Sequence, residues 1–273
     1  MEVLRTIRVL SGARRGSSRP ILVETNAGPR LVKLRGVPQG TGPLVAEIVV
    51  GAIAESLGLA VPARCLVDVD ADAYVPEGDD ELRDVMVGSG GINLGFDYLD
   101  PARDLAGRDT DSISADDRAA ILWLDRFVMN PDRTARNPNL MRSRDRTWLI
   151  DHGAALGFQY DWSLVTESTP ARPPIELDPH LFASSVLPED LLGWDEIFSA
   201  RVTRAVLESA LAEVPDIFLE PLLGSESPES SEHRRAAYVA FLWKRLEAPR
   251  GFLVPALVAS SARRGRPPRL ARP

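Results

Sequence analysis

The chain has 273 residues, of which 44% are hydrophobic and 26% charged, as in an ordinary soluble globular protein. A formal net charge of −7 does not suggest a protein that binds a nucleic-acid backbone, and no apolar run approaches the about 20 residues of a membrane-spanning helix. Cys65 is the only cysteine and the three histidines lie far apart, which excludes an intramolecular disulfide and argues against a zinc site. We therefore expect a cytoplasmic protein that does not bind membranes.

Residues 1–98 predict a β-rich unit with one helix. Alternating residues indicate a strand at 2–10, and strands at 21–25 and 30–34 flank the turn signal Asn-Ala-Gly-Pro, which predicts a hairpin. The apolar segment 44–57 ends at Gly58 and predicts a helix. Further strands are expected at 64–70 and 84–87, on either side of an acidic loop.

Residues 99–260 predict a second, mainly helical unit. Ser114 begins a capping-box pattern before an apolar helix at 114–128, and the loop NPDRTARNPN follows because proline and asparagine end the helix. A short hairpin is expected at 140–141 and 148–150, an irregular stretch at 159–180, and helices at 187–211 and 231–246. Residues 261–273 form a basic tail rich in proline and arginine, which predicts disorder.

Three polar residues around the hairpin predict phosphoryl-transfer chemistry. Asp132 and Asn137 have the spacing D-x-x-x-x-N, in which protein kinases place a catalytic carboxylate and a metal-binding amide. Asp151 closes the apolar strand Trp-Leu-Ile and precedes His-Gly, where a kinase carries its second metal ligand. Each aspartate alone could simply cap an element. The order of helix, loop, hairpin and aspartate favours the catalytic interpretation.

An upstream cation completes the pattern. Lys33 lies in the apolar strand 30–34 on the same face as Leu31, and Glu47 shares an apolar face of the following helix. We expect an ion pair between Lys33 and Glu47, with Lys33 binding nucleotide phosphates; an exposed lysine on an edge strand is the alternative. The small residues at 11–18, including Gly12, Gly16 and Ser17, would let backbone N–H groups approach the phosphates.

These segments together resemble the HipA-like kinases and, more distantly, phosphatidylinositol kinases and protein kinases. The resemblance is carried by QGTGPLVAEIVVGAIAESLGLAVPA at 39–63, FVMNPDRTARNPNLM at 127–141 and WLIDHGAALGF at 148–158. It implies a two-lobed α+β kinase fold, Asp132 as the catalytic carboxylate, Asn137 and Asp151 as Mg²⁺ ligands, and Lys33 and Glu47 at the ATP phosphates. Relatives often have histidine two places after the catalytic aspartate, where this chain has Thr134.

The sequence therefore predicts an ATP- and Mg²⁺-dependent phosphotransferase that acts on a hydroxyl group, with a protein Ser or Thr as the expected acceptor. A small molecule remains open as the acceptor, and a lipid headgroup ranks last because no basic amphipathic helix is present. The first alternative is a pseudokinase, a nucleotide-binding regulatory module that performs no transfer. The second is a helical adaptor in which the motif order is coincidental. An antitoxin partner cannot be inferred.

Overall fold

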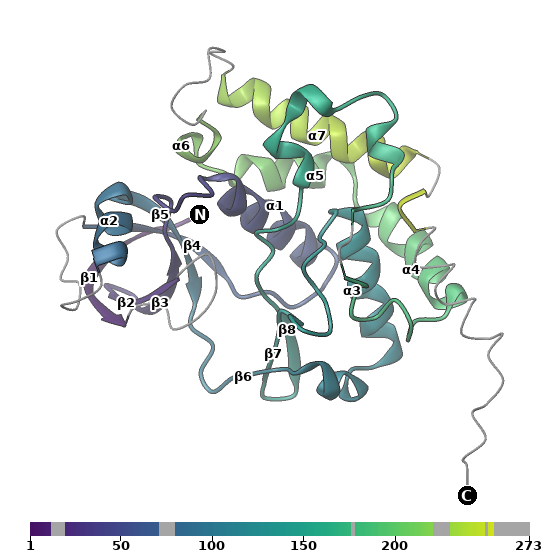
Figure 1. Ribbon diagram of the computed structural model, residues 1–273, viewed down its shortest axis with the longest axis horizontal. Coiled ribbons are helices and arrows are strands. Elements are labelled where there is room, and N and C mark those ends of the chain that lie inside the picture. The colour runs from purple at the N-terminus through teal and green to yellow at the C-terminus, as the bar shows by residue number, and fades with distance from the viewer. Residues whose placement is uncertain (12–19, 71–79, 176–177, 221–229, 249–250, 254–273) are drawn as a thin grey trace, which may run out of the picture.

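The computed structural model describes residues 1–11, 20–70, 80–175, 178–220, 230–248 and 251–253 (Figure 1). Five strands form a closed barrel in the order β1-β2-β3-β5-β4, in which β1 and β4 are parallel and all other neighbours antiparallel. They are β1 (Val3–Ser11), β2 (Ile21–Thr25), β3 (Gly28–Lys33), β4 (Arg64–Val69) and β5 (Gly91–Asp97). The hairpin predicted at 21–34 is confirmed, although its turn is only two residues long.

Helix α2 (Asp80–Gly88) occupies the segment where the sequence predicted a strand at 84–87, so that prediction is wrong, as is the expectation of a single helix before residue 98. Leu82, Val85 and Met86 are buried together with the barrel residues. Their spacing of three and four residues is helical, and the four-residue window at 84–87 was too short to reveal it.

Strand β5 was missed because its sequence, GINLGFD, contains two glycines, which weaken a strand signal. Packing explains Gly95. A Cβ atom there would lie 2.5 Å from Cγ2 of Val67 and 2.8 Å from Sγ of Cys65. Glycine is therefore required by close contact with β4, and local propensity gives no hint of that contact.

The helices share a larger core. This core joins α1 (Gly42–Ser56) to the helices of the C-terminal half, and α1 packs against α5 while α3 packs against α4 (Figure 1). The remaining helices are α3 (Ala115–Phe127), α4 (Pro188–Arg201), α5 (Arg204–Ala212), α6 (Asp216–Leu219) and α7 (Ser231–Glu247). Helix α1 is thus apolar on nearly every side because it lies between the barrel and the other helices.

Local capping explains two boundaries in the helical half. The Ser114 side chain accepts a hydrogen bond from the backbone N–H of Asp117, as the capping pattern predicted for α3. The prediction of one continuous helix at 187–211 is wrong, because α4 ends at Arg201. Thr203 then caps a separate helix, α5, by accepting a hydrogen bond from the backbone N–H of Val206.

A small antiparallel sheet completes the fold next to α3. It contains β6 (Arg103–Asp104), which the sequence did not predict, and the expected hairpin of β7 (Leu140–Ser143) and β8 (Arg146–Leu149). Residues between β8 and α4 include short 3-10 turns at Gly157–Tyr160, Trp162–Leu164 and Thr169–Ala171; two more lie at Gly107–Ser112 and Gly251–Leu253. Among the described helices, none is both long enough and apolar enough to cross a bilayer.

Candidate active site

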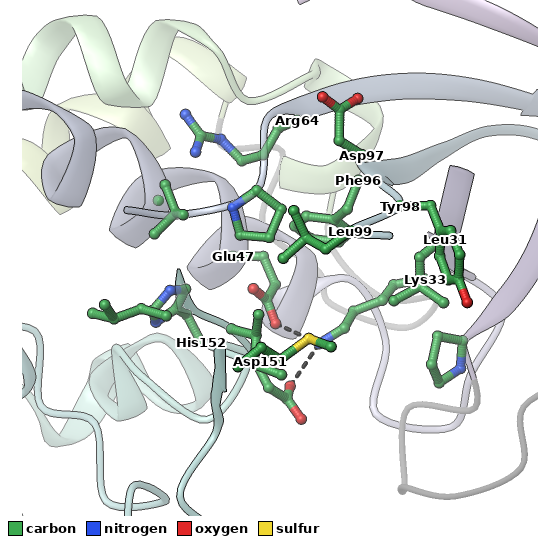
Figure 2. Close-up of a pocket in the computed structure, with 17 residues that line it drawn as sticks. Leu31, Lys33, Glu47, Arg64, Phe96, Asp97, Tyr98, Leu99, Asp151 and His152 are labelled. Carbon is green, nitrogen blue, oxygen red and sulfur yellow. Dashed lines mark hydrogen bonds and ion pairs between the residues drawn. The ribbon is translucent and has the colours of Figure 1, made fainter. Parts of the chain in front are cut away.

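Lys33 lies between two carboxylates that come from distant parts of the chain. Its Nζ atom is 2.5 Å from Oε1 of Glu47 and 2.6 Å from Oδ1 of Asp151, as the dashed lines in Figure 2 show. Lys33 is the last residue of β3, where strand alternation buries Val32 in the barrel and turns Lys33 to the opposite face. The predicted ion pair between Lys33 and Glu47 is confirmed, and Asp151 is an additional partner.

The pairing stabilises the charges of Lys33 and Asp151, whereas burial raises the pKa of Glu47 above its ordinary value. Burial alone would lower the pKa of Lys33, but the two carboxylates outweigh burial and raise that pKa above its ordinary value. Burial would likewise raise the pKa of Asp151, but the Lys33 ammonium lowers it below the ordinary range. Lys33 and Asp151 are therefore both ionised at neutral pH.

Asp151 has an unusual backbone conformation. Its φ is +56°, in the left-handed region that aspartate and asparagine tolerate better than most residues. Its side chain remains 43% exposed, whereas that of Glu47 is 1% exposed. Gly153 follows closely: a Cβ there would lie 3.2 Å from Cβ of Pro43, so glycine allows this segment to approach the start of α1. The carboxylate of Asp151 is thus the accessible one of the two that bind Lys33.

An apolar cavity of about 200 Å³ opens beside the charged cluster (Figure 2). The barrel, the segment after β5 and the β7–β8 hairpin all contribute to its wall. Its apolar lining includes Leu31, Val61, Phe96, Leu99, Met141 and Ile150. Cavities that bind small ligands commonly combine an apolar wall with a few polar groups at one place, and here Lys33, Glu47 and Asp151 supply those groups.

Asp132 is held by two asparagine amides. Its Oδ2 accepts hydrogen bonds from Nδ2 of Asn137 at 2.8 Å and from Nδ2 of Asn139 at 3.0 Å. Its backbone N–H donates to Oδ1 of Asn130 at 3.1 Å. The sequence singled out Asn137 as a metal ligand and did not single out Asn139, which is buried, whereas Asn137 is exposed. Asn139 also adopts a left-handed φ of +50°, and its carbonyl accepts from the N–H of Ile150, next to Asp151.

A buried ion pair lies beneath this loop. Asp125, near the end of α3, accepts from Nε of Arg133 at 2.6 Å and from Nδ2 of Asn130 at 2.9 Å. Burial by itself raises the pKa of Asp125, but Arg133 outweighs it and brings the pKa well below the usual range. His180 contacts the same carboxylate. The ionised carboxylate of Asp125 therefore holds the backbone on both sides of Asp132.

The segment that follows β8 adds a neutral histidine to this network. Nδ1 of His152 lies 3.5 Å from Nη2 of Arg133, and burial together with Arg133 lowers the pKa of His152 to about 3. His152 also lines the cavity (Figure 2). It is therefore neutral at physiological pH and connects the cavity wall to the ion pair under the Asp132 loop.

Comparison with known proteins agrees with this geometry. The HipA-like kinase family matches residues 6–169, more than half of the chain. The chain belongs to the HipA-like kinase family. Among solved structures, the proinflammatory kinase CtkA of Helicobacter pylori is similar with a TM-score of 0.57 and 15% identity, covering 91% of this chain and 93% of that chain. No curated protein matches.

Family membership makes this protein a kinase-type phosphotransferase, and the family implies ATP and a divalent metal in general. The likeness to CtkA shows a shared mixed α/β fold. Gly12, Gly16 and Ser17 of this HipA-like kinase lie outside the described residues, as does the basic tail. Pro20, the first described residue after that segment, lines the cavity.

Sequence reasoning missed the residues that support the Asp132 loop. Asp125 gives a weak signal, because it is an acidic residue in a helical stretch that is otherwise apolar from Ala119 to Leu124. His180 gives none, since it lies in an irregular region beyond the family match. Both contacts depend on tertiary packing.

Proposed function

We propose that this HipA-like kinase transfers the γ-phosphoryl group of ATP to the hydroxyl of a protein Ser or Thr. The observation that carries the proposal is Lys33, held between Glu47 and Asp151 at the edge of the apolar cavity. Phosphoryl transfer requires little covalent participation from the protein but demands charges in fixed positions. A buried lysine with two carboxylate partners satisfies that demand.

The cavity would bind the adenine ring between the barrel and the β7–β8 hairpin. Leu31 lies on the barrel side and Met141 and Ile150 on the hairpin side, which gives the flat base an apolar wall on each face. The polar residue Asp97, at the end of β5, lies at the rim. The phosphates would then extend toward the Lys33 ammonium, with Glu47 fixing its orientation.

The divalent ion implied by the family finds suitable donors in this chain. Mg²⁺ prefers oxygen ligands and is often bound by one or two carboxylates together with substrate phosphates. The accessible carboxylate of Asp151 and the amide oxygens of Asn137 or Asn139 fit that preference. When bound, the ion would neutralise charge on the phosphates.

Asp132 would accept the proton of the attacking hydroxyl. Both amides bind its Oδ2, and no described residue donates to its Oδ1, which is free to accept a hydrogen bond from the acceptor. The acceptor oxygen forms a bond to the γ-phosphorus, the bond to the bridging oxygen breaks, ADP leaves and the hydroxyl proton moves to Asp132.

The surroundings of Asp132 support a protein acceptor. Asp132 is only partly buried, and the neighbouring residues Ala135, Arg136 and Asn137 are exposed. A serine or threonine in an extended protein segment could therefore reach the carboxylate, which does not lie deep in a closed pocket.

Single-turnover transfer from γ-labelled ATP to a library of Ser/Thr peptides tests the proposal, with Asp132→Asn as the matched variant. We expect Asp132→Asn to bind ATP with unchanged affinity and to lose activity by about 10²- to 10⁴-fold. Equal transfer by both proteins would overturn the catalytic assignment. Tight ATP binding by the unmodified protein with no transfer to peptides or small-molecule alcohols would favour the pseudokinase.

A further inference from the structure

His180 reaches the catalytic loop from a segment outside the part of the chain that matches the family. Thr134 and His180 form an antiparallel β-bridge, and the backbone N–H of Leu181 donates to the carbonyl of Arg133 at 2.9 Å. The backbone around His180 is thus attached to the two residues that directly follow Asp132. The family match ends at residue 169, so this attachment is a feature of the C-terminal part of the chain.

Two hydrogen bonds determine where the proton on the His180 ring lies. The backbone N–H of Phe182 is 3.1 Å from Nδ1, and because an N–H can only donate, Nδ1 must be the acceptor. The proton of the neutral ring is then on Nε2, which lies 2.9 Å from Oδ2 of Asp125 and donates to it. Burial lowers the pKa of His180, in agreement with a neutral ring.

Asp125 passes this constraint on to both ends of the loop. Its Oδ1 accepts from Asn130, whose own Oδ1 accepts from the backbone N–H of Asp132. Its Oδ2 accepts from Arg133, whose Nη1 donates to the carbonyls of Pro138 and Asn139 at 3.2 and 2.5 Å. The loop from 130 to 139 is therefore closed around one carboxylate.

We infer that His180 is a positioning residue for Asp132: by donating to Asp125, it fixes the carboxylate that holds the whole catalytic loop. The inference rests on the proposed role of Asp132. Arg133 and Asn130 are both part of the loop, whereas His180 is the donor that ties Asp125 to a separate segment. Without that donor, Asp125, Arg133 and the loop can shift together.

Three substitutions separate positioning from general stabilisation. His180→Gln places an amide N–H near the position of Nε2 and retains donation to Asp125, whereas His180→Asn retains only an acceptor near the position of Nδ1. His180→Ala removes both. The Gln and Asn variants are both polar and similar in size, so they keep the test informative even if His180→Ala does not fold.

Hydrogen exchange of peptides covering 130–139 reports loop position directly and requires no catalysis. We expect exchange in these peptides to rise by about tenfold in His180→Asn, with barrel and α1 peptides unchanged and His180→Gln close to the unmodified protein. In the same series kcat should fall by about tenfold in His180→Asn and recover in His180→Gln. The dissociation constant for ATP should be the same in all variants.

Three results would overturn the inference: unchanged exchange at 130–139, an equal increase in every part of the protein, or a Gln variant as impaired as the Asn variant. Asp132→Asn is assayed alongside. If that variant still transfers phosphate, the proposed function fails, while the exchange data decide separately whether His180 holds the loop.

Discussion

Lys33 and Asp151 form an ion pair of 2.6 Å although one ends strand β3 and the other follows strand β8. Glu47 binds the same ammonium at 2.5 Å, so one lysine connects the barrel, helix α1 and the β7–β8 hairpin. Because the two carboxylates share one ammonium, the three groups should act as a unit. Removing any one of them changes the environment of the other two.

We therefore predict that Lys33→Ala and Glu47→Ala are not additive in ATP turnover. Either change alone should lower kcat/KM nearly as much as the double change, which gives a coupling of about 1–3 kcal/mol in a double-mutant cycle. The exposed pair of Arg204 and Glu208 on α5 provides a matched control, in which turnover should not change. Independent effects of Lys33 and Glu47 would contradict a functional unit.

The two asparagines beside Asp132 should contribute unequally to metal binding. Asn139 is buried and anchored next to Asp151, whereas Asn137 is exposed within the loop. We predict that Asn139→Ala weakens Mn²⁺ binding to the ATP complex by about tenfold or more, and that Asn137→Ala has a smaller effect. Electron paramagnetic resonance of Mn²⁺ measures this without turnover. The opposite order would favour the D-x-x-x-x-N spacing as the guide to the ligand.

Arg245 should be essential for the position of α3. Its guanidinium is fully buried and donates to the carbonyls of Arg126, Phe127, Pro170 and Arg172 at 2.6–2.8 Å. A lysine cannot span four acceptors, so Arg245→Lys should lower the free energy of unfolding by about 3 kcal/mol, measured in urea. Arg204→Lys, at an exposed site, is the control and should change it little. Equal stability of the two variants would show that the four contacts are not needed.

Acid should destabilise the fold through His152. Its pKa is about 3 in the folded protein and about 6.5 in an unfolded chain, so between these pH values the unfolded state binds more protons. The free energy of unfolding therefore decreases as pH falls below about 6.5, by up to about 1.4 kcal/mol per pH unit from this residue. His152→Gln should reduce the slope measured between pH 6.5 and 5 by up to about 1.4 kcal/mol per pH unit, which corresponds to one proton. Identical slopes would mean that His152 takes up a proton as readily in the folded protein as in the unfolded chain.

Local sequence was sufficient to predict the helices that have sustained periodicity and the elements that capping or turn residues bound. Helices α1, α3 and α7 and the hairpins β2–β3 and β7–β8 were predicted within a few residues, because periodicity, capping and turn residues are properties of neighbouring positions. The segment at 84–87 was misread because α2 is stabilised by packing of its apolar residues against those of the barrel. Strand β5 was missed because Gly95 is required by its close contact with β4.

The sequence alone determined which residues are available for chemistry. Strand alternation turned Lys33 away from the barrel core, and helical spacing placed Glu47 on an apolar face. The order of the motifs singled out Asp132 and Asp151. Only the tertiary structure decided which of them meet. The contact of Asp151 with Lys33, the contact of Asn139 with Asp132, and the bond from His180 to Asp125 all join residues whose side chains carry no local periodic signal. A hydrogen bond depends on distance and direction in space, and those are fixed only when the barrel, the helices and the hairpin pack against one another.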